Sequence, residues 1–393
     1  MVQPGIHGGL IMISRREFLA MGSASVFYAG FPARGFAQTR DLGKIAVIIL
    51  EGGMDGLAAV PAIGDPSLVK VRNGLISSSP IKINPFFGLH QNFVNFAEML
   101  ANNEAAIVHA TSIPYINRSH FEGQNLMQSG GTNPFALPTG WLGRTLDLVG
   151  IPGKALALDM PLIIRGGSDL DNLFPANLHG TLDLKGGMMK ALAASYDGDV
   201  AKAYTKLYER ADSQTTEAKR REAPALAFKA GQEMAKPGGP NVSVIRLNEF
   251  DTHSNQGRDD GRLPRLFSTI DEIFKNYKDG LGAAWKDSIV LTLTEFGRTV
   301  REDGSEGTDH GYGTCGLLAG GLLKRASVLA DWPGVGAKEM FQGRDLAATL
   351  DYRAVCAAAI EAAFRLPHDE IAERIFGAPK LAHVHDLLFK TNA

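Results

Sequence analysis

Four short runs of apolar residues constrain the fold of this chain most strongly. They are 44–50 (KIAVIIL), 105–110 (AAIVHA), 242–247 (VSVIRL) and 288–294 (SIVLTLT). Each run has the length and β-branched character of a strand that is buried on both faces. Between the runs, apolar residues recur at every third and fourth position, as they do in helices. The alternation predicts an α/β domain with a mostly parallel central sheet and helices on both faces.

Helical spacing is found in five segments, which are 93–100, 121–128, 189–209, 263–277 and 352–364. The segment 213–240 is polar, charged and alanine-rich, and it closes on Pro-Gly-Gly-Pro. That composition predicts a surface helix followed by a linker. Turn residues at 65–84 and 133–138 predict insertions at one end of the sheet.

The first forty residues have the pattern of an export signal. Arg15 and Arg16, followed by Glu17, precede an uncharged, partly apolar run from Phe18 to Ala33. This is the pattern of a twin-arginine signal, and the run is shorter than the roughly 20 apolar residues that span a membrane. Small residues around Ala37 predict cleavage there, which divides the chain into a signal peptide (1–37) and a single domain (38–393). We therefore expect a periplasmic protein without a transmembrane span, whose export partner is the Tat translocase; a retained N-terminal anchor is the alternative.

Charge and cysteine content narrow the range of partners. The formal net charge is −2, and loss of the arginine-rich signal would make the chain more acidic. This balance argues against binding to nucleic acid or to an anionic membrane surface. Cys315 and Cys356 are too few for a disulfide framework, although one bridge in an oxidising compartment stays open.

The first strand-like run leads into a turn that carries a carboxylate. Ligands of open α/β sheets bind beyond the carboxyl ends of the strands, so polar residues there are the candidates for chemistry. Gly52 and Gly53 permit a sharp turn and leave Asp55 near its tip. Asp55 is a candidate metal ligand, although aspartates in such turns also serve as caps.

The second run leads to a predicted helix that begins beside Arg118, Ser119 and His120. Ser119 is a natural N-cap residue, and Glu122 three positions later would complete a capping box. A hydroxyl at a helix N-terminus beside basic side chains also suits an anionic substrate. Ser119 is therefore a candidate cap and a candidate nucleophile, and the two roles are compatible.

Carboxylates and imidazoles follow the third and fourth runs. Asp251 and His253 come after the third run, Glu295 ends the fourth, and Asp309 and His310 lie in a glycine-flanked segment downstream. Oxygen and imidazole ligands in one small volume suit zinc or a similar ion. Together with the turn carboxylate, they could hold one or two divalent ions. Zinc is the first choice, with magnesium, manganese and calcium as alternatives.

The other histidines suggest no common site. His90 and His109 lie in or beside apolar runs and are predicted to be packing residues. His368, His383 and His385 fall in the C-terminal segment, where exposed surface is the favoured interpretation.

Several longer motifs follow one another in a fixed order along the chain. They are LEGGMDGL at 50–57, FFGLH at 86–90, NRSHFEGQ at 117–124, GWLGR at 140–144, FDTHSNQ at 250–256, LTEFGRT at 293–299, GTDHG at 307–311 and RDLAATLDYR at 344–353. These motifs resemble those of the DUF1501 family, which comprises secreted bacterial proteins of uncharacterised function with an alkaline phosphatase/sulfatase-like fold. The resemblance covers about residues 42 to 390.

The superfamily resemblance implies two metal ions around a hydroxyl that attacks phosphorus or sulfur. Carried over to this sequence, Ser119 would be the nucleophile and Asp55 would bridge metal and nucleophile. Arg118 and Arg298 would clamp the anion. The remaining metal ligands would be Asp251, His253, Glu295, Asp309 and His310.

Three departures limit what the resemblance implies. Glu295-Phe296 stands where the superfamily commonly has Asp-His, so one metal position lacks its imidazole. Neither Ser119 nor Ser112 lies in the sequence pattern needed for formylglycine, which argues against a sulfatase of that kind. The segment between the second run and Ser119 is long, so Ser112 and Thr111 remain alternative nucleophiles.

Two functions of different kinds fit these residues. The first is an exported metal-dependent hydrolase of phosphate or sulfate esters, acting on an anionic small molecule or a saccharide-linked ester. The second is a non-catalytic periplasmic binding protein on the same scaffold, recognising a saccharide or a surface protein. Metal-dependent turnover would discriminate between them.

Overall fold

The computed structural model describes residues 27–29, 42–150, 161–167 and 216–391, which contain an eight-stranded sheet. The sheet follows the order β1–β6–β2–β7–β8–β5–β10, and β9 also pairs with β5. The strands are β1 (Phe27–Ala29), β2 (Lys44–Leu50), β5 (Ala105–Ser112), β6 (Val242–Leu247), β7 (Ser288–Leu293), β8 (Thr314–Ala319), β9 (Ser327–Leu329) and β10 (Leu350–Asp351). A separate two-stranded ladder joins β3 (Ile81–Lys82) and β4 (Gly88–Leu89).

Most neighbouring strands are parallel. β2 pairs in parallel with β6 and β7, and β5 pairs in parallel with β9 and β10. Two strands run the other way: β8 is antiparallel to both β7 and β5, and β1 is antiparallel to β6. The predicted mostly parallel sheet is confirmed, and all four predicted strands belong to it.

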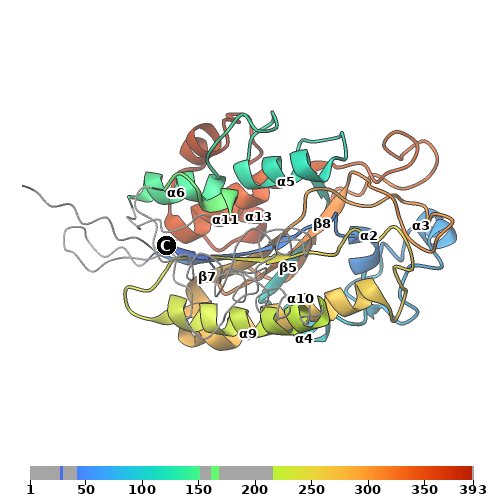
Figure 1. Ribbon diagram of the computed structural model, residues 1–393, viewed down its shortest axis with the longest axis horizontal. Coiled ribbons are helices and arrows are strands. Elements are labelled where there is room, and N and C mark those ends of the chain that lie inside the picture. Colours follow the sequence, from blue (N-terminus) through green and yellow to red (C-terminus); the bar gives the residue numbers. More distant parts are fainter. Residues whose placement is uncertain (1–26, 30–41, 151–160, 168–215, 392–393) are drawn as a thin grey trace, which may run out of the picture. The chain divides into compact units, whose positions relative to one another are not determined.

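Helices cover both faces of this sheet, as predicted (Figure 1). On one face lie α5 (His120–Ser129), α6 (Trp141–Val149), α11 (Tyr352–Phe364) and α13 (His385–Leu388); on the other lie α4 (Val94–Ala101), α9 (Thr216–Ala235) and α10 (Arg262–Leu281). The shorter elements are α2 (Gly56–Ala59), α3 (Pro66–Val71), α12 (His368–Glu370), η1 (Leu162–Ile164), η2 (Gly282–Asp287) and η3 (Ile371–Ile375). The predicted helix 189–209 lies outside the described residues. Among the described helices, none is both long and apolar enough to cross a membrane.

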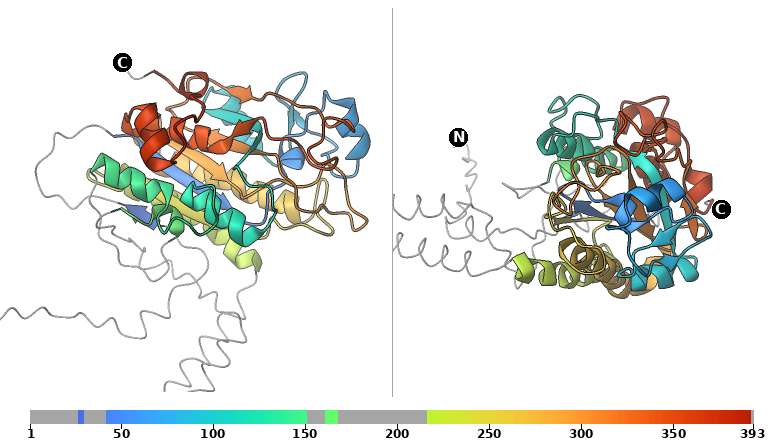
Figure 2. Two further views of the ribbon diagram at one scale, coloured as in Figure 1. Left: turned by 90° about the horizontal axis from the view of Figure 1, so that it is seen from above. Right: turned by 90° about the vertical axis from the view of Figure 1, so that its right-hand side faces the viewer.

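The core explains why these elements pack in two layers against the sheet. The interior residues of β2, from Ile45 to Leu50, are essentially inaccessible to solvent, because helices cover the sheet on both sides. α11 is buried along nearly its whole length and carries alanines at 354, 357, 358 and 359. Small side chains there let the helix lie close to β2 and β7, and α12, η3 and α13 also pack against it. The red colour of these C-terminal elements allows them to be followed in Figure 2.

Val26–Leu173 and Arg220–Ala393 form one compact unit; the other, Met1–Ser25 and Phe174–Lys219, falls almost wholly outside the described residues. β1 lies within the predicted signal peptide and pairs only with the outer edge of β6, so cleavage near Ala37 would leave the other strand pairs in place.

Cys315 and Cys356 are free and buried, and burial raises the pKa of both thiols. The disulfide that the sequence left open is not formed.

Candidate metal centre

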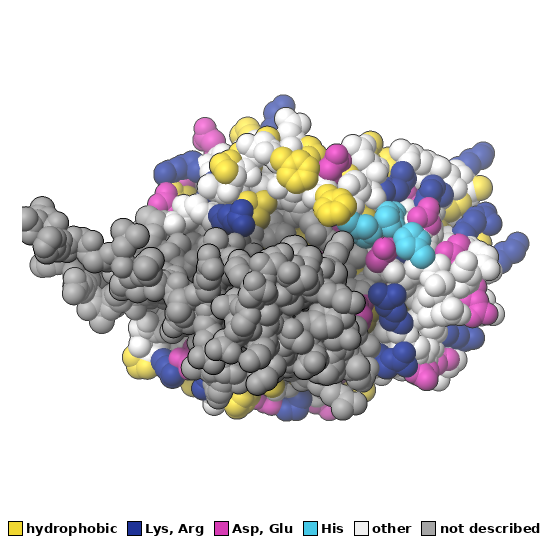
Figure 3. Space-filling view, viewed as in Figure 1, with side chains coloured by type: hydrophobic (Ala, Val, Ile, Leu, Met, Phe, Trp, Pro, Cys, Tyr) yellow, Lys and Arg dark blue, Asp and Glu magenta, His cyan; other side chains and the backbone are white. Residues whose placement is uncertain are grey.

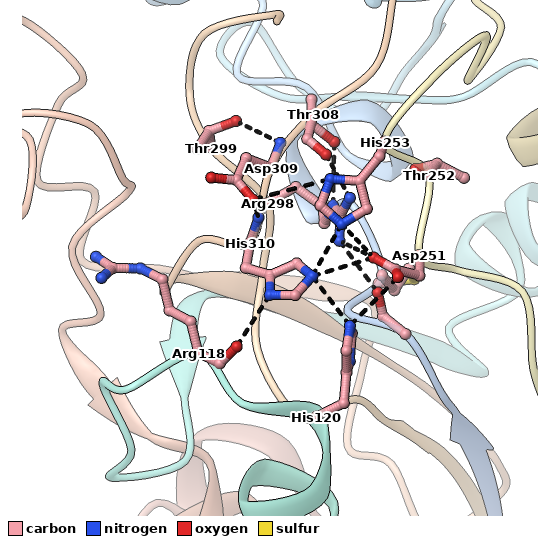
Figure 4. Close-up of polar contacts among 12 residues, drawn as sticks. Arg118, His120, Asp251, Thr252, His253, Arg298, Thr299, Thr308, Asp309 and His310 are labelled. Atoms are coloured by element: carbon pink, nitrogen blue, oxygen red, sulfur yellow. Dashed lines mark hydrogen bonds and ion pairs between the residues drawn. The ribbon is translucent and has the colours of Figure 1, made fainter.

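The carboxyl edge of the sheet collects the polar residues singled out in the sequence. Because β2, β5, β6 and β7 run in the same direction, the loops that follow them emerge at the same edge. The loops after β5, β6 and β7 bring together four side chains, which we name the His–Asp cluster: His120, Asp251, His253 and His310 (Figure 4). Figure 3 shows imidazoles gathered beside acidic side chains on this face.

One nitrogen of each imidazole points into the cluster. The Nε2 atom of His310 lies 3.0 Å from the Nε2 atoms of both His120 and His253. Asp251 Oδ1 lies 2.9 Å from His253 Nε2 and 3.2 Å from His310 Nε2, and Asp251 Oδ2 lies 3.4 Å from His120 Nε2. Three imidazoles and a carboxylate therefore converge from three segments of the chain, with Asp251 and His253 in the same one.

The other nitrogen of each ring faces an oxygen outside the cluster. His120 Nδ1 donates to Glu295 Oε1 at 2.8 Å, and His310 Nδ1 donates to the carbonyl oxygen of Arg118 at 2.9 Å. A carboxylate of Asp309 lies 3.8 Å from His253 Nδ1. Carbonyl and carboxylate oxygens only accept, so the hydrogen bonds of His120 and His310 favour a proton on Nδ1 and leave the Nε2 lone pairs of these two rings directed at the cluster.

This donor set fits a divalent metal ion. Lone pairs held about 3 Å apart require a proton or a cation between them, and outer hydrogen bonds that fix imidazole orientation are typical of metal sites. Two overlapping groups, His120–Asp251–His310 and His253–Asp309–His310, each bring three ligand atoms to within 4.8 Å of one another. Imidazole nitrogen combined with carboxylate oxygen suits zinc better than calcium, which prefers oxygen ligands alone.

At two positions of the cluster, the surroundings favour the protonation state that binds a metal ion, which is a neutral imidazole or an ionised carboxylate. Burial lowers the pKa of His310, so its ring is neutral at neutral pH. Burial tends to raise the pKa of Asp251, but the hydrogen bond and charge of Arg298 outweigh it, and the pKa lies below its usual value. The hydrogen bond that His120 donates to Glu295 raises the pKa of His120, so protons compete with a metal there as the pH falls.

Glu295 and Arg298 hold the cluster in position. Glu295 is fully buried, and its Oε1 atom accepts from Gly52 N at 2.8 Å and Gln124 Nε2 at 3.1 Å as well as from His120. It therefore orients an imidazole. Arg298, predicted to clamp an anion, is buried and donates from Nη1 to Asp251 Oδ1 at 2.8 Å, while its Nε atom donates to Thr308 Oγ1 at 3.1 Å. Its charge is directed at Asp251.

Asp55 is not brought into the cluster. Both its oxygens lie 2.8 Å from Arg72 Nη1, and Gln256 Nε2 donates to Oδ2 at 2.7 Å. The carboxylate also caps α2 by accepting from Ala58 N at 3.1 Å. Asp55 and Arg72 are both inaccessible to solvent, so they form a buried ion pair that stabilises the fold and does not contribute a ligand to the cluster.

Arg118 also has a different contact from the one predicted. Its guanidinium donates to Asp345, with an Nε–Oδ2 distance of 3.0 Å, and to Gln342 Oε1 at 2.6 Å. Figure 4 shows this side chain pointing away from the His–Asp cluster. Arg118 contributes its carbonyl oxygen to the site, through His310.

The candidate hydroxyls lie in three different settings. Ser119 is the N-cap of α5, as predicted, but its side chain makes no capping hydrogen bond. The predicted capping box is wrong, because Glu122 accepts from the Tyr115 hydroxyl at 2.6 Å instead. Thr111 Oγ1 donates to the Leu350 carbonyl at 2.8 Å, whereas Ser112 Oγ is buried without a hydrogen-bond partner among the described residues.

His120 is the cluster residue that the sequence analysis did not select as a ligand. It is the first residue of α5, and its ring lies 4.9 Å from that of Phe296, between ring centroids. The available signal was its position directly after a helix N-cap within NRSHFEGQ, at a strand's carboxyl end.

Solved structures that are similar to this chain share about a tenth of its sequence. It is similar to Ps i-CgsB in complex with k-i-k-neocarrahexaose, with 11% identity, a TM-score of 0.41, and 88% of this chain and 74% of that chain covered. It is also similar to the C-terminal periplasmic domain of EcEptC from Escherichia coli in complex with Zn, with 9% identity, a TM-score of 0.30, and 75% and 76% covered. No curated protein matches the sequence.

The family comparison is specific. The family described as "Protein of unknown function (DUF1501)" matches residues 86–375, which is well over half of the chain. The matched region contains every residue of the His–Asp cluster together with Glu295 and Arg298. This protein belongs to the DUF1501 family.

Proposed function

We propose that this protein is an exported, metal-dependent hydrolase of phosphate or sulfate esters. The observation that carries the proposal is the convergence of three imidazole nitrogens and a carboxylate at a solvent-accessible surface. The side chains of Asp251 and His253 are 41% and 46% exposed, so a substrate could reach the ligands. Catalytic metal sites keep such an open position, whereas structural sites are closed by protein ligands.

The chain supplies both the ligands and a cation for an anionic substrate. His120, Asp251, His253 and His310 would hold the ion, with Asp309 beside His253. A divalent ion bound there supplies positive charge that stabilises the charge developing on the ester oxygens. Arg344 is 39% exposed and donates from Nη2 to Asp309 Oδ2 at 2.9 Å, so its guanidinium could also contact an anion.

Ser119 is the favoured nucleophile. Its backbone opens α5 directly before His120, and its hydroxyl is not engaged in capping the helix. A helix N-terminus also favours negative charge, which would assist ionisation of the hydroxyl. Thr111 is less suited, because its hydroxyl proton is already donated to Leu350.

One observation favours the alternative, a periplasmic binding protein that recognises a saccharide or a surface protein. No serine or threonine hydroxyl of the described residues is hydrogen-bonded to an imidazole of the His–Asp cluster. Such a protein would use the ion and Arg344 to hold an anionic group without attacking it.

Elemental analysis of the purified mature protein, combined with a screen of generic phosphate and sulfate esters, tests the proposal. We expect bound divalent metal and turnover that is lost on chelation and restored by the ion. Ser119→Ala should then abolish turnover while retaining metal, whereas Ser112→Ala, at the alternative nucleophile, should retain both. Loss of turnover in Ser112→Ala instead would assign the attack to Ser112. Bound metal without turnover of any ester would favour the binding protein, and absence of metal would contradict both.

Export through the twin-arginine pathway is a separate prediction. Changing Arg15→Lys together with Arg16→Lys preserves the charge but removes the pair that the translocase recognises. We expect the variant to accumulate in the cytoplasm, as measured by fractionation and immunoblotting. Lys44→Arg is a control outside the signal and should be exported normally. Periplasmic delivery of the double variant would contradict the prediction.

A further inference from the structure

A second group of ligand-type side chains lies near the end of α11. Glu361 of α11, His368 at the start of α12 and His383 before α13 each offer one ligand atom, all within 4.8 Å of one another. His383 Nε2 lies 2.9 Å from Glu361 Oε2, and the rings of His368 and His383 stack with their centroids 4.4 Å apart. We name these three residues the C-terminal triad.

The orientation of His368 is what distinguishes the triad from an ordinary surface cluster. Its Nε2 atom donates to the carbonyl oxygen of Leu381 at 3.0 Å, which places the ring proton on Nε2. The Nδ1 atom is then an acceptor, and it is buried with no hydrogen-bond partner among the described residues. An unpartnered buried nitrogen carries a free-energy cost that a bound cation would remove.

We propose that the C-terminal triad is a second site for a divalent transition-metal ion of the zinc class. Two imidazole nitrogens and one carboxylate oxygen suit zinc and disfavour magnesium or calcium, which prefer oxygen ligands alone. The hydrogen bond to Leu381 is the kind of outer contact that fixes the tautomer of a ligating histidine. The side chain of His383 is 48% exposed, so an ion can enter from solvent.

This site is separate from the His–Asp cluster. Gly43, directly before β2, donates from its backbone nitrogen to the Ala363 carbonyl at 2.7 Å. The end of α11 therefore lies at the amino edge of the sheet, whereas the His–Asp cluster lies beyond the carboxyl ends of the strands. The two sites share no residue, so each can be emptied without the other.

An ion at the triad would have a structural role. It would join Glu361 to His383, which are 22 positions apart, and so secure the segment that folds back over α11. The following stretch is already attached by backbone hydrogen bonds from Lys324 to Leu388 and from Lys390 to Leu322. An ion that binds only the folded chain would stabilise that state and so raise the melting temperature.

The test uses the whole chain in a His120→Ala/His310→Ala background, which removes the first site. Chelator-stripped protein is titrated with Zn²⁺ in competition with a chromophoric chelator, and its melting temperature is measured with and without Zn²⁺. We expect one equivalent bound and a zinc-dependent rise in melting temperature. Adding His383→Ala, a change at a half-exposed position, should abolish both effects.

Two glutamate substitutions, one inside the triad and one outside it, test whether the carboxylate of the triad binds zinc. Glu361→Gln in the same background should weaken zinc binding at least tenfold, whereas Glu370→Gln, outside the triad but close to His368 in sequence, should not change it. Retention of the zinc equivalent after His383→Ala, or no zinc binding by the background protein, would overturn the proposal. In the otherwise wild-type chain, His383→Ala should leave metal binding at the His–Asp cluster unchanged.

Discussion

His310→Ala is expected to remove the metal ion of the His–Asp cluster and to abolish metal-dependent turnover. His310 Nε2 lies 3.0 Å from the Nε2 atoms of both other imidazoles, and His310 belongs to both groups of ligand atoms in the cluster. Changing residues that only orient ligands costs about 10- to 100-fold in metal affinity, so loss of this shared ligand should cost more than about 100-fold. Metal titration of the purified variant, followed by an ester assay, measures both effects.

His253→Ala is the graded comparison for this prediction. His253 is more exposed than His310, and its Nδ1 atom lies 3.8 Å from Asp309 Oδ1, beyond hydrogen-bond distance, so we expect a smaller loss of affinity. Circular dichroism should show unchanged helix and strand content in both variants. Full metal retention by His310→Ala would remove His310 from the ligand set and contradict the proposed centre.

Asp55→Asn is expected to lower the free energy of unfolding by about 3–5 kcal/mol, the usual cost of removing one partner from a buried ion pair. The change leaves the guanidinium of Arg72 buried without its counter-charge, since its other donors are bound to the Val300 and Thr299 carbonyls. Urea denaturation monitored by fluorescence measures the loss. Folded variant protein should bind the same amount of metal as the wild type.

The control for Asp55 is a double-mutant cycle with Arg72→Met. Because each single change leaves an unmatched charge or polar group, we expect the double variant to be more stable than the sum of the two losses predicts. Wild-type stability combined with loss of metal in Asp55→Asn would show that Asp55 is a ligand, as the superfamily resemblance implied.

The fold could largely be predicted because its central strands are short, continuous apolar runs. β2 and β6 begin and end where the sequence predicted, and α11 does as well. β8 was not predicted. Its residues, TCGLLA, include a glycine and lack the alternation of apolar and polar residues that is typical of a half-exposed strand. Its antiparallel place between β7 and β5 depends on pairing between distant segments, which periodicity does not encode.

The residue types of the site could be predicted, but their roles could not. Asp55, Asp251 and Glu295 all follow strands, yet the structure pairs Asp55 with an arginine, places Asp251 among imidazoles and makes Glu295 a hydrogen-bond acceptor for His120. These differences arise from partners that are 17, 47 and 175 positions away, so no local pattern distinguishes the three carboxylates.

The discontinuity of the His–Asp cluster links ion capture to the completion of folding. His120 and His310 are 190 positions apart, so an unfolded chain cannot present both to one ion without a large entropic cost. High-affinity capture therefore requires that the strands supporting the loops have already paired. If the chain crosses the inner membrane after folding, as its paired arginines predict, the identity of the ion is decided by the metals that the cytoplasm makes accessible, before the protein meets the composition of the outer compartment.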